Sequence, residues 1–153
     1  MKVLFICTGN TCRSPMAEAI LMHLSPNDEV KSAGIFANEA GHTNENTVSI
    51  LKQKNIEINH QVQQVTSDLI QWAEVVLTMT SSHKDILLSQ FSGASHKIFT
   101  LIEYVTERDE IENLDIEDPF GGVLSDYDMV FNELHTHLQS FIKKTSTNKG
   151  GKT

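Results

Sequence analysis

The feature that most constrains this chain is a short apolar segment that leads directly into a polar cluster containing glycine. Residues 2–6 are almost continuously apolar, and the stretch CTGNTCRSP begins at Cys7. An apolar run of this length that ends at a glycine-containing turn is typical of a strand buried on both faces of a parallel sheet. Pro15 suits the first turn of a helix, so the sequence predicts a strand, a tight loop and a helix in that order.

The rest of the chain alternates between strand and helix patterns. We expect further strands at residues 30–35, 74–80 and 97–104, and helices at residues 15–24, 43–54, 66–73, 81–91 and 125–144, with loops at 36–42 and 106–117. This alternation indicates an α/β fold: a single domain with a central, mostly parallel four-stranded sheet flanked by helices. Residues 145–153 are polar and contain glycine, which predicts a disordered tail after a domain of residues 1–144.

The composition excludes several classes of protein. With 153 residues, of which 39% are hydrophobic and 21% charged, the chain resembles an ordinary globular domain and can bury a sizeable core. Its apolar runs fall short of the roughly 20 residues that span a bilayer, and the N-terminus lacks the pattern of a signal peptide. We therefore expect a cytoplasmic protein that does not insert into a membrane.

The charge balance and the cysteines narrow the choice further. A formal net charge of -8 disfavours broad attraction to nucleic acid or to an anionic membrane, so any bound anion must be held by a local site. Cys7 and Cys12 are too few for a disulfide framework and are expected to be free thiols in a reducing compartment. The seven histidines are scattered, and His135 and His137 would face different sides of one helix, so no metal site is expected.

The cluster after the first strand has the composition of an anion site built around a nucleophile. Five residues separate Cys7 from Arg13, so the loop between them can curl into a ring of backbone N–H groups around the thiol. Gly9 would permit backbone conformations that are closed to other residues, and the following helix would add the positive end of its dipole. Arg13 can offer two parallel hydrogen bonds to phosphate oxygens. The same positive surroundings favour the thiolate of Cys7, which is its nucleophilic form.

With these residues in place, the sequence resembles the low-molecular-weight protein-tyrosine-phosphatase family, whose N-terminal signature is Cys-x5-Arg-Ser. The residues in register with that family directly after the first strand are Cys7, Gly9, Asn10, Cys12, Arg13, Ser14 and Pro15. The likeness continues through SAG at residues 32–34 and DPFGG at residues 118–122, and it covers the chain up to the tail. The resemblance implies the phosphotyrosine phosphatase I-like fold, a flavodoxin-like three-layer sandwich.

The resemblance also implies a two-step hydrolysis of phosphorylated protein substrates. Cys7 would attack phosphorus and form a phosphocysteine while Asp118 protonates the leaving group, and water would then hydrolyse the intermediate with Asp118 as base. Arg13 and the loop amides would hold the phosphoryl oxygens. Ser14 would donate a hydrogen bond to the Cys7 thiolate, and Asn10 would brace the loop. The substrate-binding residues implied are Thr8, Gly9, Asn10, Thr11, Cys12, Ser14 and Phe120. No cofactor or metal is required, and we expect a monomer.

Some of these residues have simpler explanations that the sequence leaves open. Cys12 is either a structural thiol or a redox partner that forms a reversible disulfide with Cys7. Asp118, directly before a proline, could be only a turn former. Phe120 and Phe36 each lie in a loop near the expected site, and either could form the wall of a substrate pocket.

Other functions on the same pattern are less favoured. Thiol-dependent arsenate reductases share this fold and loop, but they need further cysteines downstream, and the chain has none after Cys12. A non-catalytic phosphate-binding module would lack the nucleophile, the arginine or the acid, whereas all three are present. A nucleotide-binding P-loop is excluded because the motif Gly-x4-Gly-Lys-Ser/Thr does not occur.

Position 11 bears on which phosphorylated residue is the substrate. Members of the family that act on phosphotyrosine commonly have an aliphatic residue where this chain has Thr11. The stretch CTGNTCRS instead resembles bacterial protein-arginine phosphatases, which have a threonine there. The sequence therefore favours a phosphoarginine phosphatase, with a phosphotyrosine phosphatase of the same family as the alternative.

Overall fold

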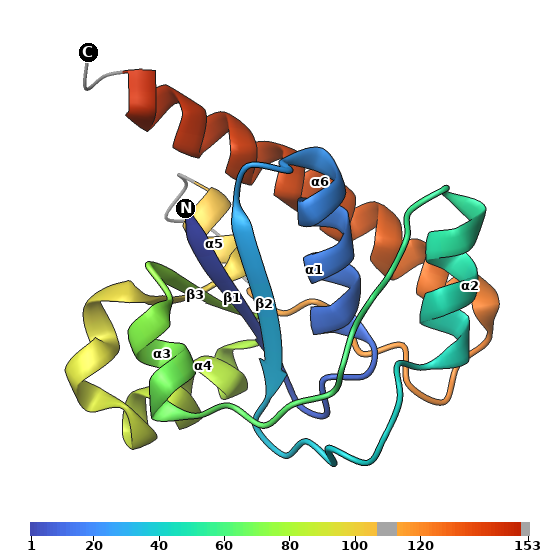
Figure 1. Cartoon of the computed structure of the whole chain (residues 1–153), viewed down its shortest axis with the longest axis horizontal. Coiled ribbons are helices and arrows are strands. Elements are labelled where there is room, and N and C mark those ends of the chain that lie inside the picture. Colours follow the sequence, from blue (N-terminus) through green and yellow to red (C-terminus); the bar gives the residue numbers. More distant parts are fainter. Residues whose placement is uncertain (107–112, 151–153) are drawn as a thin grey trace.

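A parallel sheet of four strands organises the molecule (Figure 1). The computed structural model describes residues 1–106 and 113–150, the last three by their backbone alone. In spatial order the strands are β2 (Glu29–Gly34), β1 (Lys2–Cys7), β3 (Val75–Thr78) and β4 (Ile98–Thr100), and each pair of neighbours is parallel. The predicted α/β fold with a central parallel sheet is therefore confirmed.

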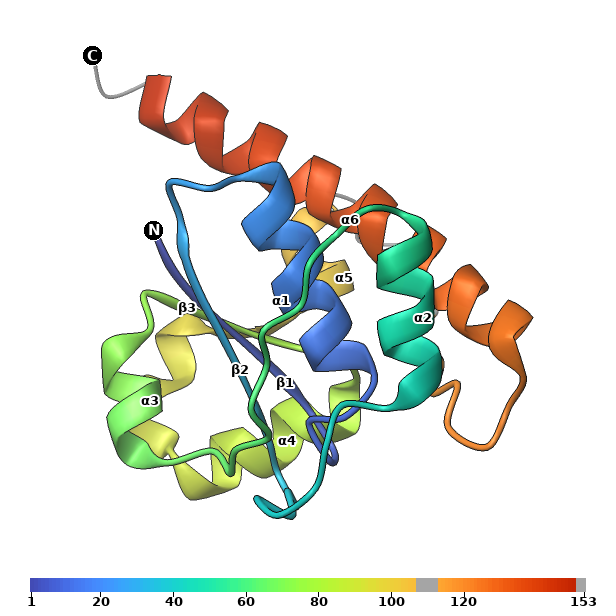
Figure 2. The same ribbon diagram turned by 45° about the vertical axis from the view of Figure 1, so that its right-hand side comes forward.

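Helices lie on both faces of this sheet (Figures 1 and 2). They are α1 (Arg13–Leu24), α2 (Glu45–Gln53), α3 (Ser67–Trp72), α4 (Ser81–Gln90), the 3₁₀ helix η1 (Ser92–Lys97), α5 (Leu101–Val105) and α6 (Leu124–Gly150). On one face α1 and α5 pack against the strands, and α6 packs against α1, α2 and α5. The other face is covered by α3, α4 and η1. The result is the sheet flanked by helices that the alternating sequence pattern predicts.

The first strand is buried on both of its faces. Val3 and Phe5 belong to the core that includes α1 and α6, whereas the alternate residues Leu4 and Ile6 belong to the core that includes α3 and α4. All four side chains are fully buried. A central parallel strand between two layers of helices needs apolar residues at every position, which explains the continuous apolar run at the start of the sequence.

The fourth strand is shorter than predicted. The sequence predicted a strand over residues 97–104, but the chain leaves the sheet after Thr100 and forms α5. A capping box begins this helix: the Thr100 side chain accepts a hydrogen bond from the Glu103 N–H (3.0 Å), and the Glu103 carboxylate accepts one from the Thr100 N–H (2.7 Å). Lys84 of α4 binds the same carboxylate at 2.8 Å. These polar contacts turn an apolar segment with strand character into a helix.

The last helix is longer than predicted. The sequence predicted that it ends at residue 144 and that a disordered tail follows, whereas α6 continues to residue 150. Thr145 accounts for part of this difference, because its side chain is buried and its hydroxyl donates to the backbone oxygens of Phe141 and Ile142 (3.1 and 3.2 Å). The remaining tail residues, 151–153, lie outside the described residues, as do 107–112 of the predicted loop.

The other predicted strands and helices are present, each within two residues of its expected ends. The helix η1 was not predicted. The sheet order places a topological switch point at the carboxyl end of β1, because β2 lies on one side of β1 and β3 on the other. The loop that follows β1 leads to a helix on one face of the sheet, and the loop that follows β3 leads to a helix on the other face. The two loops therefore diverge at the carboxyl ends of these strands, where α/β proteins commonly bind ligands. The cluster that begins at Cys7 occupies this position.

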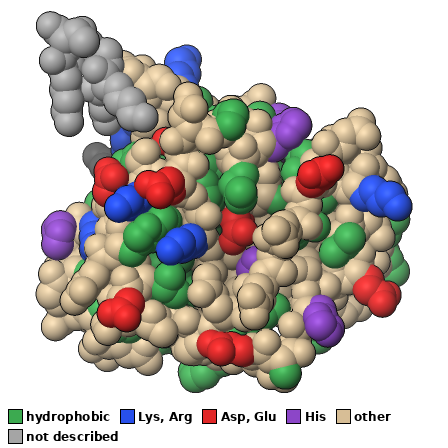
Figure 3. Space-filling model, viewed as in Figure 1, with side chains coloured by type: hydrophobic (Ala, Val, Ile, Leu, Met, Phe, Trp, Pro, Cys, Tyr) green, Lys and Arg blue, Asp and Glu red, His purple; other side chains and the backbone are tan. Residues whose placement is uncertain are grey.

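Charged side chains of both signs are mixed on the face of the molecule shown in Figure 3. On that face, Lys and Arg do not gather into an extended basic patch of the kind that binds nucleic acid or an anionic membrane. Among the described residues, no helix is long and apolar enough to cross a membrane.

Candidate active site

The loop between β1 and α1 depends on Asn10 for its shape. Asn10 has a left-handed backbone conformation (φ 59°) and is completely buried. Its side-chain amide donates to Ser14 Oγ and Ser32 Oγ (2.9 Å each), and its side-chain oxygen accepts from the Gln63 N–H (2.9 Å). Gly9, which was expected to supply the unusual conformation, has no positive φ, so that expectation is wrong. Asparagine tolerates the left-handed region, and its side-chain hydrogen bonds hold it there.

Gly34, at the end of β2, allows this loop to lie close against the sheet. A β-carbon at this position would lie 2.6 Å from the Thr8 carbonyl oxygen and 3.0 Å from the Asn10 nitrogen. Both are backbone atoms, so neither can move aside as a flexible side chain would. The Phe36 N–H also donates to the Thr8 carbonyl oxygen (2.9 Å). The glycine of the SAG stretch is therefore required by the loop that packs against it.

Cys7 Sγ lies 2.8 Å from Ser14 Oγ, and both side chains are buried. Ser14 Oγ accepts a hydrogen bond from the Asn10 amide, so its own proton is free to be donated to Cys7 Sγ. The structure thus brings Ser14 and Cys7 together, as the resemblance implies.

Arg13 joins this loop to the segment that carries Asp118. The guanidinium is buried: Nη1 donates to the Ile116 carbonyl oxygen (2.9 Å), and Nη2 lies 3.6 Å from Asp118 Oδ2. The Ile116 N–H donates in turn to the Met79 carbonyl oxygen (2.8 Å), which ties the segment to the end of β3. Asp118 Oδ1 accepts from the Phe120 N–H (3.0 Å). Asp118 therefore does form a turn, and it also presents its other oxygen to Arg13.

A cavity of about 210 Å³ lies between these two loops. Its lining consists of Cys7, Thr8, Gly9, Thr11, Cys12, Arg13, Asp118 and Phe120. We call it the catalytic cavity. Asn10 and Ser14 were also expected to contact substrate, but they are fully buried and brace the loop from behind. Phe120 forms part of the wall, whereas Phe36 is not among the described residues that line it.

Sequence reasoning missed a group of polar residues behind the loop. His60 Nε2 donates to the Asn10 carbonyl oxygen (3.0 Å), and His60 Nδ1 lies 3.5 Å from Glu18 Oε1. Ser32 Oγ donates to the same carboxylate (2.6 Å). These residues are far apart along the chain and show no common spacing, so the sequence contains no local signal that connects them. Within the described parts of the chain, no cluster of three or more potential metal ligands occurs.

His83, in the first turn of α4, contacts the loop from the opposite side and was also missed. Its Nε2 lies 2.8 Å from Thr8 Oγ1. Burial, reinforced by the positive charge of Arg13, lowers the pKa of His83 to about 4, so the ring is neutral at pH 7. Among the described residues, Nδ1 has no hydrogen-bond partner. A buried N–H without a partner is rarer than an unpaired acceptor, so we assign the proton to Nε2, which donates to Thr8 Oγ1.

Cys12 is the second thiol of the catalytic cavity. Its Sγ lies 3.7 Å from Thr11 Oγ1 and 3.8 Å from the hydroxyl of Tyr127 on α6. Burial raises the pKa of the Cys12 thiol, which is therefore protonated near neutral pH. Cys7 and Cys12 are both free. The contacts are compatible with either a structural thiol or a redox partner of Cys7.

Comparison with known proteins identifies the class of enzyme that this site belongs to. Residues 2–150 match the family described as low molecular weight phosphotyrosine protein phosphatase. A protein-arginine-phosphatase from Geobacillus stearothermophilus is 44% identical over 147 residues, which cover 95% of this chain and 97% of that protein. The low molecular weight protein-tyrosine-phosphatase PtpB from Staphylococcus aureus is 39% identical over 135 residues, covering 88% and 91%.

A solved structure has the same fold. It is YwlE arginine phosphatase, a C7S mutant with a phosphorylated active site serine, and it is 40% identical to this chain. The TM-score is 0.89, and the alignment covers 95% of this chain and 96% of that chain. The chain belongs to the low molecular weight phosphotyrosine protein phosphatase family. It is a cysteine-dependent protein phosphatase.

Proposed function

We propose that this phosphatase hydrolyses phosphoarginine in proteins and that Thr11 favours this substrate. The observation that carries the proposal is that Thr11 lines the same cavity as Cys7, Arg13 and Asp118. A phosphorylated guanidinium is planar and rich in N–H donors, and both a threonine hydroxyl and a carboxylate can accept hydrogen bonds from it. An aryl ring offers no such donors. The similarity to a relative named as a protein-arginine-phosphatase supports the same substrate.

In the proposed first step, the Cys7 thiolate attacks phosphorus and the P–N bond to the guanidinium breaks as the P–S bond forms. Asp118 gives its proton to the departing nitrogen. Arg13 and the backbone N–H groups of the loop bind the phosphoryl oxygens, and Ser14 stabilises the Cys7 thiolate before the attack. The phosphorylated serine in the C7S mutant of YwlE supports a phosphoryl group carried on the residue at this position.

In the proposed second step, water attacks the phosphorus of the phosphocysteine. The Asp118 carboxylate takes a proton from the water as the P–S bond breaks, so the Cys7 thiolate and inorganic phosphate are released. Asp118 returns to its protonated form and is ready for the next cycle. The 3.6 Å separation between Asp118 and the buried guanidinium of Arg13 supports a position of the carboxylate beside the phosphoryl group.

Phosphotyrosine is the second candidate substrate, and Phe120 is the observation that favours it. Its ring lines the cavity and is 73% exposed, so it could stack on an aromatic substrate side chain. The relative from Staphylococcus aureus is named as a protein-tyrosine-phosphatase. We further infer that the enzyme acts as a monomer in the cytoplasm, where a reducing environment would keep its two free cysteines as thiols.

The choice between the two substrates is tested by replacing Thr11. We expect Thr11→Val, which keeps the shape but removes the hydroxyl, and Thr11→Ile, which adds apolar surface, to lower kcat/KM for a phosphoarginine peptide. An unpaired buried donor costs about 1–3 kcal/mol, so the loss is roughly one to two decades. Both variants should raise kcat/KM for phosphotyrosine.

Thr11→Ser is the matched control, because it keeps the hydroxyl and should keep the preference for phosphoarginine. The measurement is the ratio of kcat/KM for phosphoarginine and phosphotyrosine peptides of the same flanking sequence. If this ratio is the same in Thr11→Ile and in the unchanged enzyme, Thr11 is not the selector and the phosphotyrosine proposal becomes preferable.

A further inference from the structure

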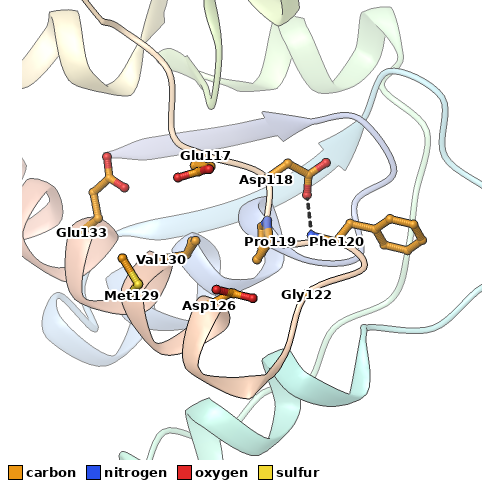
Figure 4. Close-up of a pocket in the computed structure, with 9 residues that line it drawn as sticks. All are labelled: Glu117, Asp118, Pro119, Phe120, Gly122, Asp126, Met129, Val130 and Glu133. Atoms are coloured by element: carbon orange, nitrogen blue, oxygen red, sulfur yellow. Dashed lines mark hydrogen bonds between the residues drawn. The ribbon is translucent and has the colours of Figure 1, made fainter.

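A second cavity adjoins the catalytic cavity, on the side of the Asp118 segment that faces α6 (Figure 4). Its volume is about 480 Å³. Its lining consists of Glu117, Asp118, Pro119, Phe120, Gly122, Asp126, Met129, Val130 and Glu133. Asp118 and Phe120 line both cavities. A polypeptide with its phosphorylated side chain in the catalytic cavity therefore meets this second cavity on one side of Phe120.

The carboxylates of the second cavity are only partly balanced by the fold. Asp118 is paired with Arg13, and Asp126 Oδ2 accepts from the Val123 N–H (2.9 Å) at the start of α6. Glu117 and Glu133 are less well balanced by neighbouring groups than these two carboxylates. Neither Lys nor Arg is among the described residues that line the cavity.

Glu117 and Glu133 lie at the end of the cavity away from Phe120 (Figure 4). In the described part of the chain, Glu117 has no ion-pair partner, and that of Glu133 is His137, with Nε2 at 3.8 Å. Burial lowers the pKa of His137, so this ring is neutral at pH 7 and does not offset the charge. Burial, and then the charge of Glu117, raises the pKa of Glu133. A cation between the two carboxylates would reduce this repulsion.

The other walls of the second cavity are apolar and accessible. Met129 is 68% exposed on α6, and Phe120 lines the side toward the catalytic cavity, with its ring directed away from Met129 (Figure 4). Single exposed apolar side chains are ordinary, but Met129 shares this hollow with carboxylates that the fold does not balance. Lysine and arginine side chains have this combination of properties, because their methylene stems pack on apolar surface while the charged head remains at polar groups.

We propose that the second cavity binds a lysine or arginine side chain of the phosphoprotein substrate, from a residue close in sequence to the phosphorylated one. The cationic head lies between Glu117 and Glu133, and the stem packs on Met129. The established activity on proteins requires that the chain on each side of the phosphorylated residue passes over the rim of the catalytic cavity. The second cavity would bind this neighbouring side chain in phosphoarginine and phosphotyrosine substrates alike, so the proposal does not depend on the proposed function of Thr11.

The test uses three peptides that share one central phosphoarginine and differ only in the two neighbours on each side, which are Lys, Ala or Glu. The enzymes compared are the unchanged protein, Glu133→Gln, the double variant Glu117→Gln/Glu133→Gln, and Glu74→Gln. Glu74 is an exposed glutamate just before β3, at the opposite end of that strand from the site, and its replacement makes the same change in net charge as Glu133→Gln. The readout is the ratio of kcat/KM for the Lys and Glu peptides, in which any loss of folded enzyme cancels.

We expect the unchanged enzyme and Glu74→Gln to prefer the Lys peptide roughly 3- to 10-fold, and high salt to reduce this preference, as for partly exposed ion pairs. The double variant should have a ratio near one, and Glu133→Gln an intermediate ratio. The proposal is overturned if the unchanged enzyme shows no preference, if the double variant keeps it, or if Glu74→Gln loses it to the same extent. Repeating the series with phosphotyrosine keeps this test independent of the substrate residue.

Discussion

A left-handed backbone at a residue other than glycine costs about 1–3 kcal/mol, and at Asn10 hydrogen bonds offset this cost. Both polar atoms of its side chain are bonded, and its carbonyl oxygen accepts from His60. One buried residue therefore sets the shape of the loop without lining the catalytic cavity. Glycine was the natural choice for this role from sequence alone, because the partners that hold Asn10 come from distant segments.

The close contact at Gly34 leads to a prediction for Gly34→Ala. The added methyl group meets three backbone atoms of the loop, so the loop or the end of β2 must shift. We expect kcat/KM for an aryl phosphate to fall at least tenfold and the free energy of unfolding to fall by about 1–3 kcal/mol. Gly93→Ala is the control, since a β-carbon at Gly93 would have no atom within 4 Å. Urea unfolding and steady-state kinetics on both variants measure these two losses. A Gly34→Ala variant that is fully active and fully stable would contradict the predicted clash.

The two thiols of the catalytic cavity lead to a prediction for peroxide. Peroxide oxidises the Cys7 thiolate to a sulfenic acid, and the Cys12 thiol then attacks that sulfur, forming a disulfide with loss of water. We expect this disulfide to protect Cys7, and thiol reductants to restore activity. Mass spectrometry of the oxidised enzyme checks the outcome, with Cys12→Ser as the comparison that should proceed to an irreversible sulfinic acid. A sulfinic acid on Cys7 beside a free Cys12 in the unchanged enzyme would count against a redox role.

At the scale of elements, the sequence predicted what is encoded locally. The apolar run of β1 and the helical pattern of α1 depend on neighbours in the chain, and both were found. The segment at residues 97–104 is apolar in a way that suits a strand or a helix. The capping box between Thr100 and Glu103 starts a helix in its second half. The position of the loop from Cys7 to Ser14 was predictable for the same reason, because its residues form one short motif.

The supporting residues of the site were not predictable, because distance along the chain separates them from the loop. His60 lies 50 residues from Asn10, and His83 lies 75 residues from Thr8. A histidine in a sequence is compatible with a surface, a core or a metal site, and only the packing of α4 against the loop gives His83 its role. The same applies to Glu18, which contacts His60 across the fold.

The link between α4 and the loop predicts how stability depends on pH. The pKa of His83 is about 4 in the folded protein, below the ordinary value of 6.5, so between these values the unfolded chain binds a proton that the folded protein does not. Stability is therefore lost as the pH falls from about 6.5 toward 4. At pH 4 the free energy of unfolding is lowered by about 3 kcal/mol through this one histidine.

The measurement is urea unfolding of the unchanged enzyme and of His83→Asn at several pH values from 7.5 to 4, a range set by the usual titration of histidine. His83→Asn cannot titrate but can still donate to Thr8, so its stability should fall less steeply with acid. His23→Asn is the control, because it removes an exposed histidine of α1. Equal slopes for His83→Asn and the unchanged enzyme would show that His83 is not the titrating group.

At the scale of the whole molecule, the site joins two segments that are far apart in the sequence. Cys7 and Arg13 come from the first loop, whereas Ile116 and Asp118 come from the segment that precedes α6, and the bond between Arg13 and Ile116 spans 103 residues. The net charge of -8 opposes general binding of anions, so a bound phosphate is held by this local assembly alone. Anything that binds here binds only the folded chain.

Phosphate should therefore stabilise the whole fold, by about 2.7 kcal/mol at a concentration one hundred times its Kd. We expect Cys7→Ser to lose all turnover but to keep this stabilisation, because the loop amides and Arg13 bind the anion while only the nucleophile is missing. Arg13→Lys should lose most of it, since an ammonium group cannot form two parallel hydrogen bonds to phosphate. The measurement is Tm in phosphate against chloride at equal ionic strength, for the three proteins together with their activity on an aryl phosphate. If Arg13→Lys is stabilised as much as the unchanged enzyme, or if Cys7→Ser retains turnover, the assignment of binding to Arg13 and of chemistry to Cys7 fails.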